Sequence, residues 1–235
     1  MNVQPLTLMS TLAVFAPLKG RIAHMFESEA GVSLNVRFDP TTVLLDALEK
    51  GDDADAIIAT DVAIDALIAK GILLTAGRVN IARTAVGIAK RLGARPLDIS
   101  SPAKCVDVLR NAKSIAYSKT GASGIFFDDL IERLGIADEV RSKAIIIPKG
   151  FTAELLVSGE AELAIQQMSE LAAIPGVDLV GALPEPYSSY TTFSAAVFKA
   201  SKRQGQARLF TNYLTNARSV SALSDAGLEP IGVAS

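Results

Sequence analysis

Short apolar runs alternate with longer amphipathic runs along almost all 235 residues of this chain. The first apolar run, 6–9, is followed by apolar residues at helical spacing from Leu12 to Phe26. The alternation returns in the second half, where a strand-like run at 114–117 precedes a helical run at 123–134. Strands that alternate with helices form mostly parallel sheets covered on both faces. The pattern therefore predicts an α/β fold.

The charged and metal-binding residues exclude several classes of function. The net charge is −2, and Lys and Arg are scattered, so no nucleic-acid surface is expected. Cys105 and His24 are the only residues of their types, which excludes a disulfide framework and multi-histidine or cysteine metal sites. We expect Cys105 to be a buried apolar residue and His24 to lie at the surface. No metal ion or cofactor is predicted.

The sequence also bears on where the protein works. Every apolar run is interrupted well before about 18 residues, so no membrane insertion is expected. The first five residues lack the basic, apolar and small-residue parts of a secretory signal. As the sequence stands, this favours the cytoplasm; a mature form from which an export signal was removed would be periplasmic.

Two strands divide the chain into lobes. A long strand predicted at 79–90 and a later one at 191–198 fit a pair of crossovers between two domains. The prediction is a discontinuous lobe of residues 1–83 and 191–235, a second lobe of residues 84–190, and a ligand cleft between them. Hinge closure over the ligand would follow from this arrangement. Tyr187 and Tyr190, near the return crossover, are expected to pack at the hinge.

Small hydroxyl residues follow three of the predicted strands and precede helices. Helix starts carry free N–H groups and attract anions, and ligands of α/β folds bind beyond the carboxyl ends of strands. The three junctions therefore predict a small-anion site. Its residues are Ser10 and Thr11, Thr41 and Thr42, and the loop Lys119, Thr120, Gly121, Ala122 and Ser123. The alternative is that Ser10, Thr11 and Thr41 only cap helices, and that Gly121 and Gly124 only serve turn geometry.

Several segments resemble one bacterial family in the right order. Segments 6–12 (LTLMSTL) and 51–61 (GDDADAIIATD) resemble the start of bacterial molybdate-binding proteins, the substrate-binding components of ABC importers. Segments 70–73, 80–83 and 157–165 are similar to later parts of the same family. The resemblance implies a type II periplasmic-binding-protein fold, in which two lobes close on an oxyanion, and an ABC permease as a partner.

The resemblance also implies roles for individual residues. Ser10, with Thr11 beside it, matches the hydroxyl of the family's first oxyanion-binding loop. Thr41 or Thr42 matches the hydroxyl that opens the second helix, and the loop from Gly121 to Ser123 matches that of the middle lobe.

The chain departs from the family in its loops. The first loop reads MSTL where the family usually has Ala-Ala-Ser-Leu, and the second reads DPTT where the family has a Gly-rich loop. Gln166 and Gln167 stand where the family shows an apolar residue followed by Tyr. Amide groups beside several hydroxyls predict a larger anion, such as a di- or tricarboxylate.

An enzymatic alternative follows from a related protein type. Aconitate isomerase resembles the same family, which implies an isomerase that moves a proton in a polycarboxylate. Lys119 would then balance carboxylate charge or act as the base, with Glu170 and His24 as weaker candidates. The alternative is that Lys119 is a solvated surface charge with no role in binding or catalysis. The acidic run Asp52, Asp53 and Asp55 is predicted to be a solvated turn.

Overall fold

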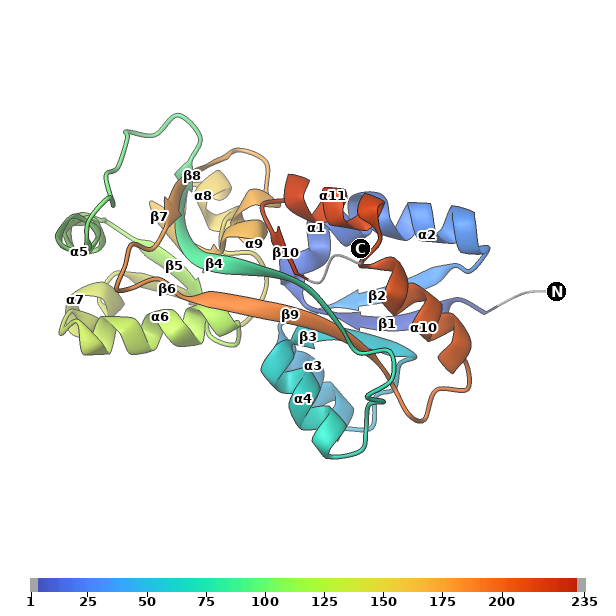
Figure 1. Cartoon of the computed structure of the whole chain (residues 1–235). Coiled ribbons are helices and arrows are strands. Elements are labelled where there is room, and N and C mark those ends of the chain that lie inside the picture. Colours follow the sequence, from blue (N-terminus) through green and yellow to red (C-terminus); the bar gives the residue numbers. More distant parts are fainter. Residues whose placement is uncertain (1–3, 232–235) are drawn as a thin grey trace. The chain divides into compact units, whose positions relative to one another are not determined.

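The computed structural model describes residues 4–231, which form two compact units (Figure 1). Unit 1 runs to Arg83 and resumes at Thr192, and unit 2 comprises Thr84–Thr191. Strands β4 (Val79–Arg91) and β9 (Tyr190–Val197) contain the two points at which the chain passes from one unit to the other.

The sheet of unit 1 is centred on parallel strands. Strand β1 (Leu6–Ser10) pairs in parallel with β2 (Leu34–Phe38) and with β3 (Ala56–Thr60). Ser10 lies opposite Phe38 and Ile58, so the carboxyl ends of the three strands meet at one edge. Antiparallel neighbours complete the sheet, because β9 pairs with β3, and the short β10 (Glu229–Pro230) pairs with β4.

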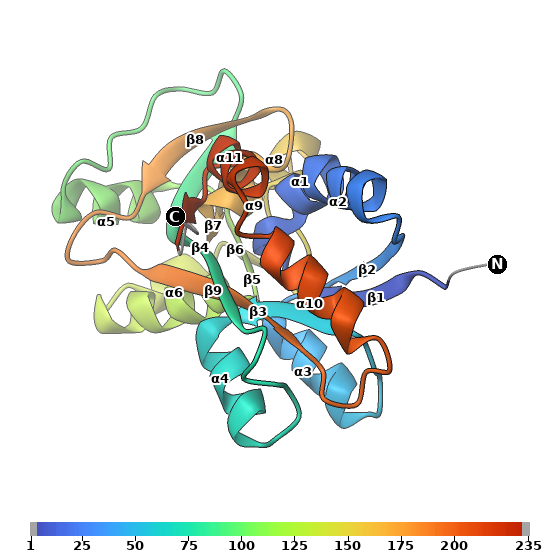
Figure 2. The same cartoon turned by 45° about the vertical axis from the view of Figure 1, so that its right-hand side comes forward.

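Helices cover both faces of this sheet (Figures 1 and 2). On one face, Leu8 and Ile58 pack in a core with the first helical segment and the last two helices, and on the other, Met9 and Ile57 pack against two middle helices. The alternation follows from the two-residue period of a strand. The helices are η1 (Leu12–Val14), α1 (Phe15–Pro17), η2 (Leu18–Ile22), α2 (Ala23–Ala30), α10 (Gln204–Tyr213) and α11 (Ala217–Asp225) on the first face, and α3 (Thr41–Glu49) and α4 (Asp61–Ala69) on the second.

Unit 2 repeats this organisation. Strand β5 (Ile115–Ser118) pairs in parallel with β6 (Ala144–Ile147) and β7 (Leu163–Gln167), and β4 pairs antiparallel with β7 and with β8 (Val177–Ala182). The first core of this unit contains side chains of α5 (Pro102–Asn111), α6 (Ala122–Arg133) and α7 (Ala137–Arg141). The second core contains side chains of α8 (Glu154–Ser158) and α9 (Met168–Ala172).

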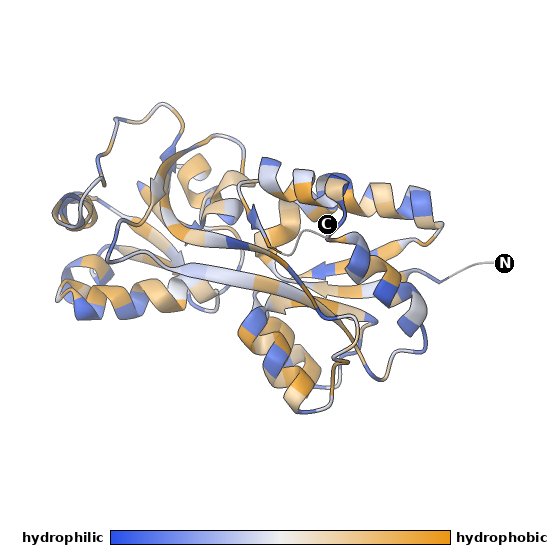
Figure 3. Ribbon diagram, in the orientation of Figure 1, coloured by the Kyte–Doolittle hydropathy of each residue, from blue (hydrophilic) through white to orange (hydrophobic). Residues whose placement is uncertain are grey.

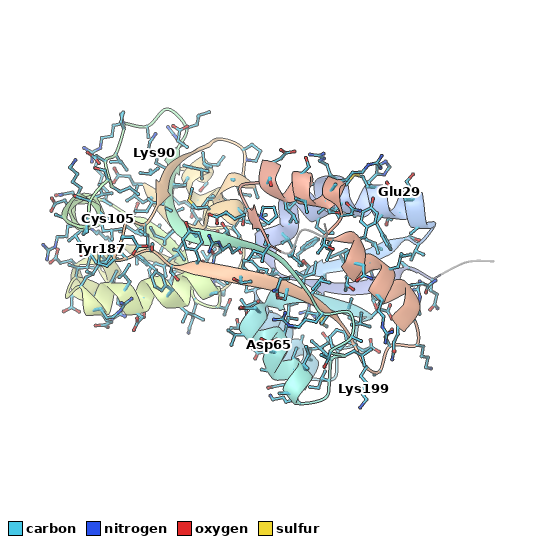
Figure 4. All side chains as sticks on the ribbon, in the orientation of Figure 1. Glu29, Asp65, Lys90, Cys105, Tyr187 and Lys199 are labelled. Atoms are coloured by element: carbon cyan, nitrogen blue, oxygen red, sulfur yellow. The ribbon has the colours of Figure 1, made fainter. Side chains whose placement is uncertain are left out.

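Hydrophobic colouring follows this layering. Helix α6 carries both hydrophobic and hydrophilic residues along its length (Figure 3). Its buried side chains include Phe127, Leu130 and Ile131, at the spacing of one helix face. Cys105 of α5 lies in the same core and is buried, as predicted, which raises the pKa of its thiol to about 11 (Figure 4). His24 is exposed, also as predicted.

Two segments depart from a simple alternation of strands and α-helices. The segment 175–186, rich in Pro and Gly, contains β8. The helical run predicted from Leu12 is confirmed and extends without a gap to Ala30, but it changes from a 3-10 turn to an α turn, a π turn and an α-helix. Pro17 has no N–H to donate to Ala13, which prevents one regular α-helix there.

The prediction that Asp55 belongs to a solvated turn is wrong, because this residue is only 9% exposed. One carboxylate oxygen accepts hydrogen bonds from the N–H and hydroxyl of Thr7 at 2.9 and 3.1 Å, and the other accepts from the Ser201 hydroxyl at 2.6 Å. Asp55 therefore joins the start of the sheet to the chain that follows β9. Among residues 4–231, no helix is long and apolar enough to cross a membrane.

Candidate functional site

Several of the predicted site residues of unit 1 lie at the edge formed by the carboxyl ends of β1, β2 and β3. Ser10 is completely buried, and its hydroxyl donates to the carbonyl oxygen of Thr11 at 3.1 Å. The Thr11 N–H donates to the Ile58 carbonyl at 2.9 Å, which holds the turn after β1 against β3. Thr11 makes no side-chain cap to the helical turn that follows. Thr11 therefore occupies the N-cap position of η1, but its side chain does not cap the turn.

Thr41 fastens the start of α3 to the end of β3. Its hydroxyl accepts a hydrogen bond from the N–H of Thr60 at 3.3 Å. Pro40, not Thr41, occupies the N-cap position, and Thr42 lies half-buried in the first turn. The three hydroxyl positions 11, 41 and 42 thus lie around one edge, together with the amino end of a nine-residue helix.

Arg37 forms ion pairs with two carboxylates near this edge. Asp39 follows β2, and its N–H donates to the Ser10 carbonyl at 3.1 Å. The guanidinium of Arg37 donates to Asp39 at 2.8 Å and to Asp52 at 2.6 Å. The hydrogen bond to Asp39 is the main cause of the raised pKa of Arg37. Because the charge of Arg37 is already paired, the donors of this edge are mainly neutral groups.

The second edge lies at the carboxyl ends of β5, β6 and β7 in unit 2. The Ser118 hydroxyl accepts from the Gly121 N–H at 3.0 Å and so shapes the loop that leads into α6. A Cβ on Gly124 would lie 1.7 Å from the Ser118 carbonyl oxygen. Only glycine lets the first turn of α6 pack this closely on β5. Ser123, in the same turn, is 1% exposed.

The loops after β5 and β6 are tied together at this edge. The N–H of Lys119 donates to the Ile147 carbonyl at 2.8 Å, and the Thr120 hydroxyl donates to the Pro148 carbonyl at 2.7 Å. The side chain of Lys119 is exposed. Lys119 therefore brings a positive charge to the edge that carries Ser118 and Ser123, on a backbone that is held in place.

Gln166 and Gln167 have structural partners. The Gln166 carbonyl oxygen accepts from the N–H and hydroxyl of Thr152, both at 2.9 Å, and its amide nitrogen donates to the Gly150 carbonyl at 2.9 Å. The Gln167 amide lies 2.7 Å from the Thr191 hydroxyl. Both side chains are 2% exposed. Contact of either with a ligand stays a prediction.

Glu170 is the remaining titratable group at the end of β7. It is 7% exposed, and burial raises the pKa of its carboxyl to about 8 against the opposing hydrogen bonds from Gln167 N–H and the Gln166 side chain. From the sequence, Glu170 is only a weaker candidate for the base. The sequence feature that could have singled it out is its position three residues after Gln167, the N-cap of α9, because a carboxylate at this position folds back on the cap.

Two α/β units, each with hydroxyls and a helix start at the carboxyl ends of its strands, have the organisation of a periplasmic-binding-protein fold. The sequence pattern of the family described as bacterial extracellular solute-binding protein matches residues 6–229, and the chain belongs to this family.

Relatives and solved structures agree with this family. The chain is 30% identical over 235 residues to aconitate isomerase of Pseudomonas sp, covering 97% of this chain and 89% of the relative. The periplasmic molybdate-binding protein of Azotobacter vinelandii has a TM-score of 0.76 at 15% identity, covering 95% of this chain and 98% of that one. The substrate-binding domain of a putative molybdenum ABC transporter from Clostridium difficile has a TM-score of 0.70 at 17% identity, covering 97% and 99%. The resemblance inferred from sequence is confirmed, and so is the predicted fold class.

Proposed function

We propose that this solute-binding protein holds a small oxyanion or a di- or tricarboxylate, with donors from both strand-end edges. The two units, divided near residues 83 and 191, would close on the ligand. The observation that carries the proposal is that each edge combines hydroxyl groups with the amino end of a helix. These are Thr11, Thr41 and α3 in unit 1, and Ser118, Ser123 and α6 in unit 2.

Neutral donors can supply the affinity. A hydrogen bond to a charged acceptor contributes about 1.5–3 kcal/mol, and a helix start adds roughly 0.3–1 kcal/mol for an anion. At the upper ends of these ranges, four hydrogen bonds and two helix starts contribute roughly 14 kcal/mol, which covers the about 8 kcal/mol of a micromolar Kd and an immobilisation cost of about 4 kcal/mol or slightly more. The exposed ammonium group of Lys119 favours a ligand with more than one negative charge.

Membership of this solute-binding family supports a role in transport. We propose an ABC permease as the partner and a location outside the inner membrane, because the family is described as extracellular and a structural neighbour is part of a putative molybdenum ABC transporter.

A thermal-shift series tests the binding proposal. A ligand that binds only the folded protein raises its melting temperature with the logarithm of ligand concentration over Kd. Molybdate, tungstate, sulfate, phosphate, citrate and both aconitates form the panel. We expect at least one anion to raise the melting temperature, and the double variant Ser10→Ala, Thr41→Val to reduce that shift. Ser158→Ala, an exposed hydroxyl on α8, is the matched control and should leave the shift unchanged. The absence of a shift with every anion would contradict the proposal.

The full-length identity to aconitate isomerase favours a second candidate function, the isomerisation of a polycarboxylate. Moving a double bond next to a carboxylate requires removal of a proton from one carbon and its return to another. Lys119 or Glu170 would be the base. Proton NMR of trans-aconitate with the protein would show the cis isomer if the protein is an enzyme, and an unchanged spectrum with binding would leave it a binder.

A further inference from the structure

Glu170 lies at the strand-end edge of unit 2. Helix α9 begins at Met168, directly after the last residue of β7. The Glu170 carboxyl accepts a hydrogen bond from the Gln167 N–H, so it turns back toward the end of β7. Strand β7 runs parallel to β5, whose end carries Ser118. The carboxyl and the loop that leads into α6 therefore belong to the same edge.

Within residues 4–231, no cation is among the causes that set the pKa of the Glu170 carboxyl. The elements packed most closely against α9 are β7, which has no titratable residue, and β8. Asp178 of β8 is paired with Lys90 of β4 at 2.7 Å. Lys90 lies opposite Leu163, the first residue of β7, whereas Glu170 follows the last residue of that strand. A buried carboxyl without a cation favours its neutral, protonated form.

Two further polar groups near the end of β7 lack partners. The Ser169 and Thr84 hydroxyls are buried, and neither makes a hydrogen bond within the described part of the chain. The carbonyl of Thr84 faces the Gln167 amide at 3.2 Å, which places Thr84 beside the same strand end. Buried hydroxyls normally find a partner, so these two unsatisfied hydroxyls near the end of β7 point to a polar group that binds there.

We propose that Glu170 is a ligand-binding residue that donates the proton of its neutral carboxyl to an oxygen of the bound anion. This inference rests on the proposed anion-binding function and adds proton coupling to it. The neutral acid attracts an anion as a hydrogen-bond donor, whereas the ionised carboxylate repels it. Binding then requires that Glu170 carry its proton.

The coupling predicts a specific pH dependence. Since the pKa of Glu170 is about 8, most of the free protein carries the proton at pH 7 and most has lost it at pH 9. An anion that binds only the protonated form would bind roughly tenfold more weakly at pH 9 than at pH 7. The binding reaction at pH 9 would take up close to one proton.

Isothermal titration calorimetry with trans-aconitate and with molybdate tests this inference. Both probes keep a constant charge between pH 7 and 9, so a change in affinity comes from the protein. Titrations in two buffers with different ionisation enthalpies measure the proton uptake of the wild-type protein directly. We expect roughly tenfold weaker binding at pH 9 and proton uptake at that pH. Glu170→Gln keeps a donor that does not titrate, so its affinity should be nearly constant, while the exposed Glu160→Gln control should follow the wild type.

The outcomes separate the two proposals. Binding that is independent of pH in the wild type, or a pH dependence that persists in Glu170→Gln, would overturn the role of Glu170 and leave the anion-binding function standing. Failure of both probes and of the wider anion panel to bind would overturn both. Should Glu170→Gln fail to fold, the proton uptake of the wild type still decides the question.

Discussion

The side-chain amide of Gln167 lies 2.7 Å from the hydroxyl of Thr191 and joins the end of β7 to β9. The amide oxygen faces this hydroxyl, because the nitrogen can then donate to the carbonyls of Thr84 at 3.2 Å and Ala85 at 3.3 Å on β4. Thr84 and Thr191 are the first and last residues of unit 2. One buried side chain therefore connects the two strands through which the chain enters and leaves this unit.

Replacing Gln167 by Leu should destabilise the protein by roughly 2–4 kcal/mol, because the half-buried Thr191 hydroxyl and two carbonyls would lose a partner. Urea unfolding measures the change. Gln204→Leu is the control, since Gln204 makes one exposed hydrogen bond to the Lys199 carbonyl. It should cost less than about 1 kcal/mol. Equal losses in the two variants would argue against the role assigned to Gln167.

Gly124→Ala should disrupt the loop before α6, because the new Cβ would overlap the Ser118 carbonyl oxygen. We expect a loss of roughly 3 kcal/mol or more in unfolding free energy and a weaker response to anions in the thermal-shift panel. Gly205→Ala provides the comparison, since nothing lies within 4 Å of a Cβ at that helical position. It should be neutral or stabilise by up to about 1 kcal/mol. A Gly124→Ala protein as stable as the wild type would contradict the close packing.

Hydropathy alone predicts the order of the elements well, since the alternation of apolar and amphipathic runs is a local property. Helix starts are less predictable. Asp61 fits an N-cap by residue type, but Thr60 occupies that position, and the Asp61 carboxylate accepts from the N–H of Val62 at 2.8 Å within the first turn. The cap position depends on where β3 ends, which is set by its pairing with β1 and β9.

The partners of the candidate site residues could not be predicted, because they are remote in sequence. Gln166 bonds to Thr152, and Gln167 to Thr191, across separations of 14 and 24 residues. Two adjacent glutamines at the end of a strand suggest a ligand site equally well, and only the fold shows that their amides hold neighbouring segments. The raised pKa of Glu170 has the same origin, since it comes from burial between elements rather than from residue type.

Lys119→Ala should weaken binding of a divalent or trivalent anion by roughly two- to fivefold at low ionic strength, because the exposed ammonium acts through partly screened charge. The difference from the wild type should shrink as salt rises from 20 to 300 mM. Lys202→Ala, an exposed cation of unit 1, is the control and should change affinity little. If the protein isomerises aconitate and Lys119 is its base, turnover would be lost while binding persists. A variant with unchanged affinity and turnover would remove Lys119 from the site.

Glu170 also predicts how stability depends on pH. In the unfolded chain its pKa is near 4.5, and in the folded protein burial raises it to about 8. Between these values the folded state binds more protons than the unfolded state, so this residue makes the protein less stable as pH rises from about 5 to 8. Glu170→Gln removes the titration and can still accept the Gln167 N–H. Relative to the wild type, the variant should therefore gain stability with pH, by up to roughly 4 kcal/mol between pH 5 and 8.

Urea unfolding of both proteins at pH 5, 6.5 and 8 gives the difference directly, and the exposed Glu160→Gln variant serves as the reference. Other groups that titrate in this range are common to all three proteins, so their contributions cancel in the comparison. A constant difference between Glu170→Gln and the wild type over the three pH values would mean that the carboxyl is ionised in the folded protein at pH 6.5. The same result would remove the basis for proton-coupled anion binding, because a carboxylate already charged at neutral pH has no proton to donate.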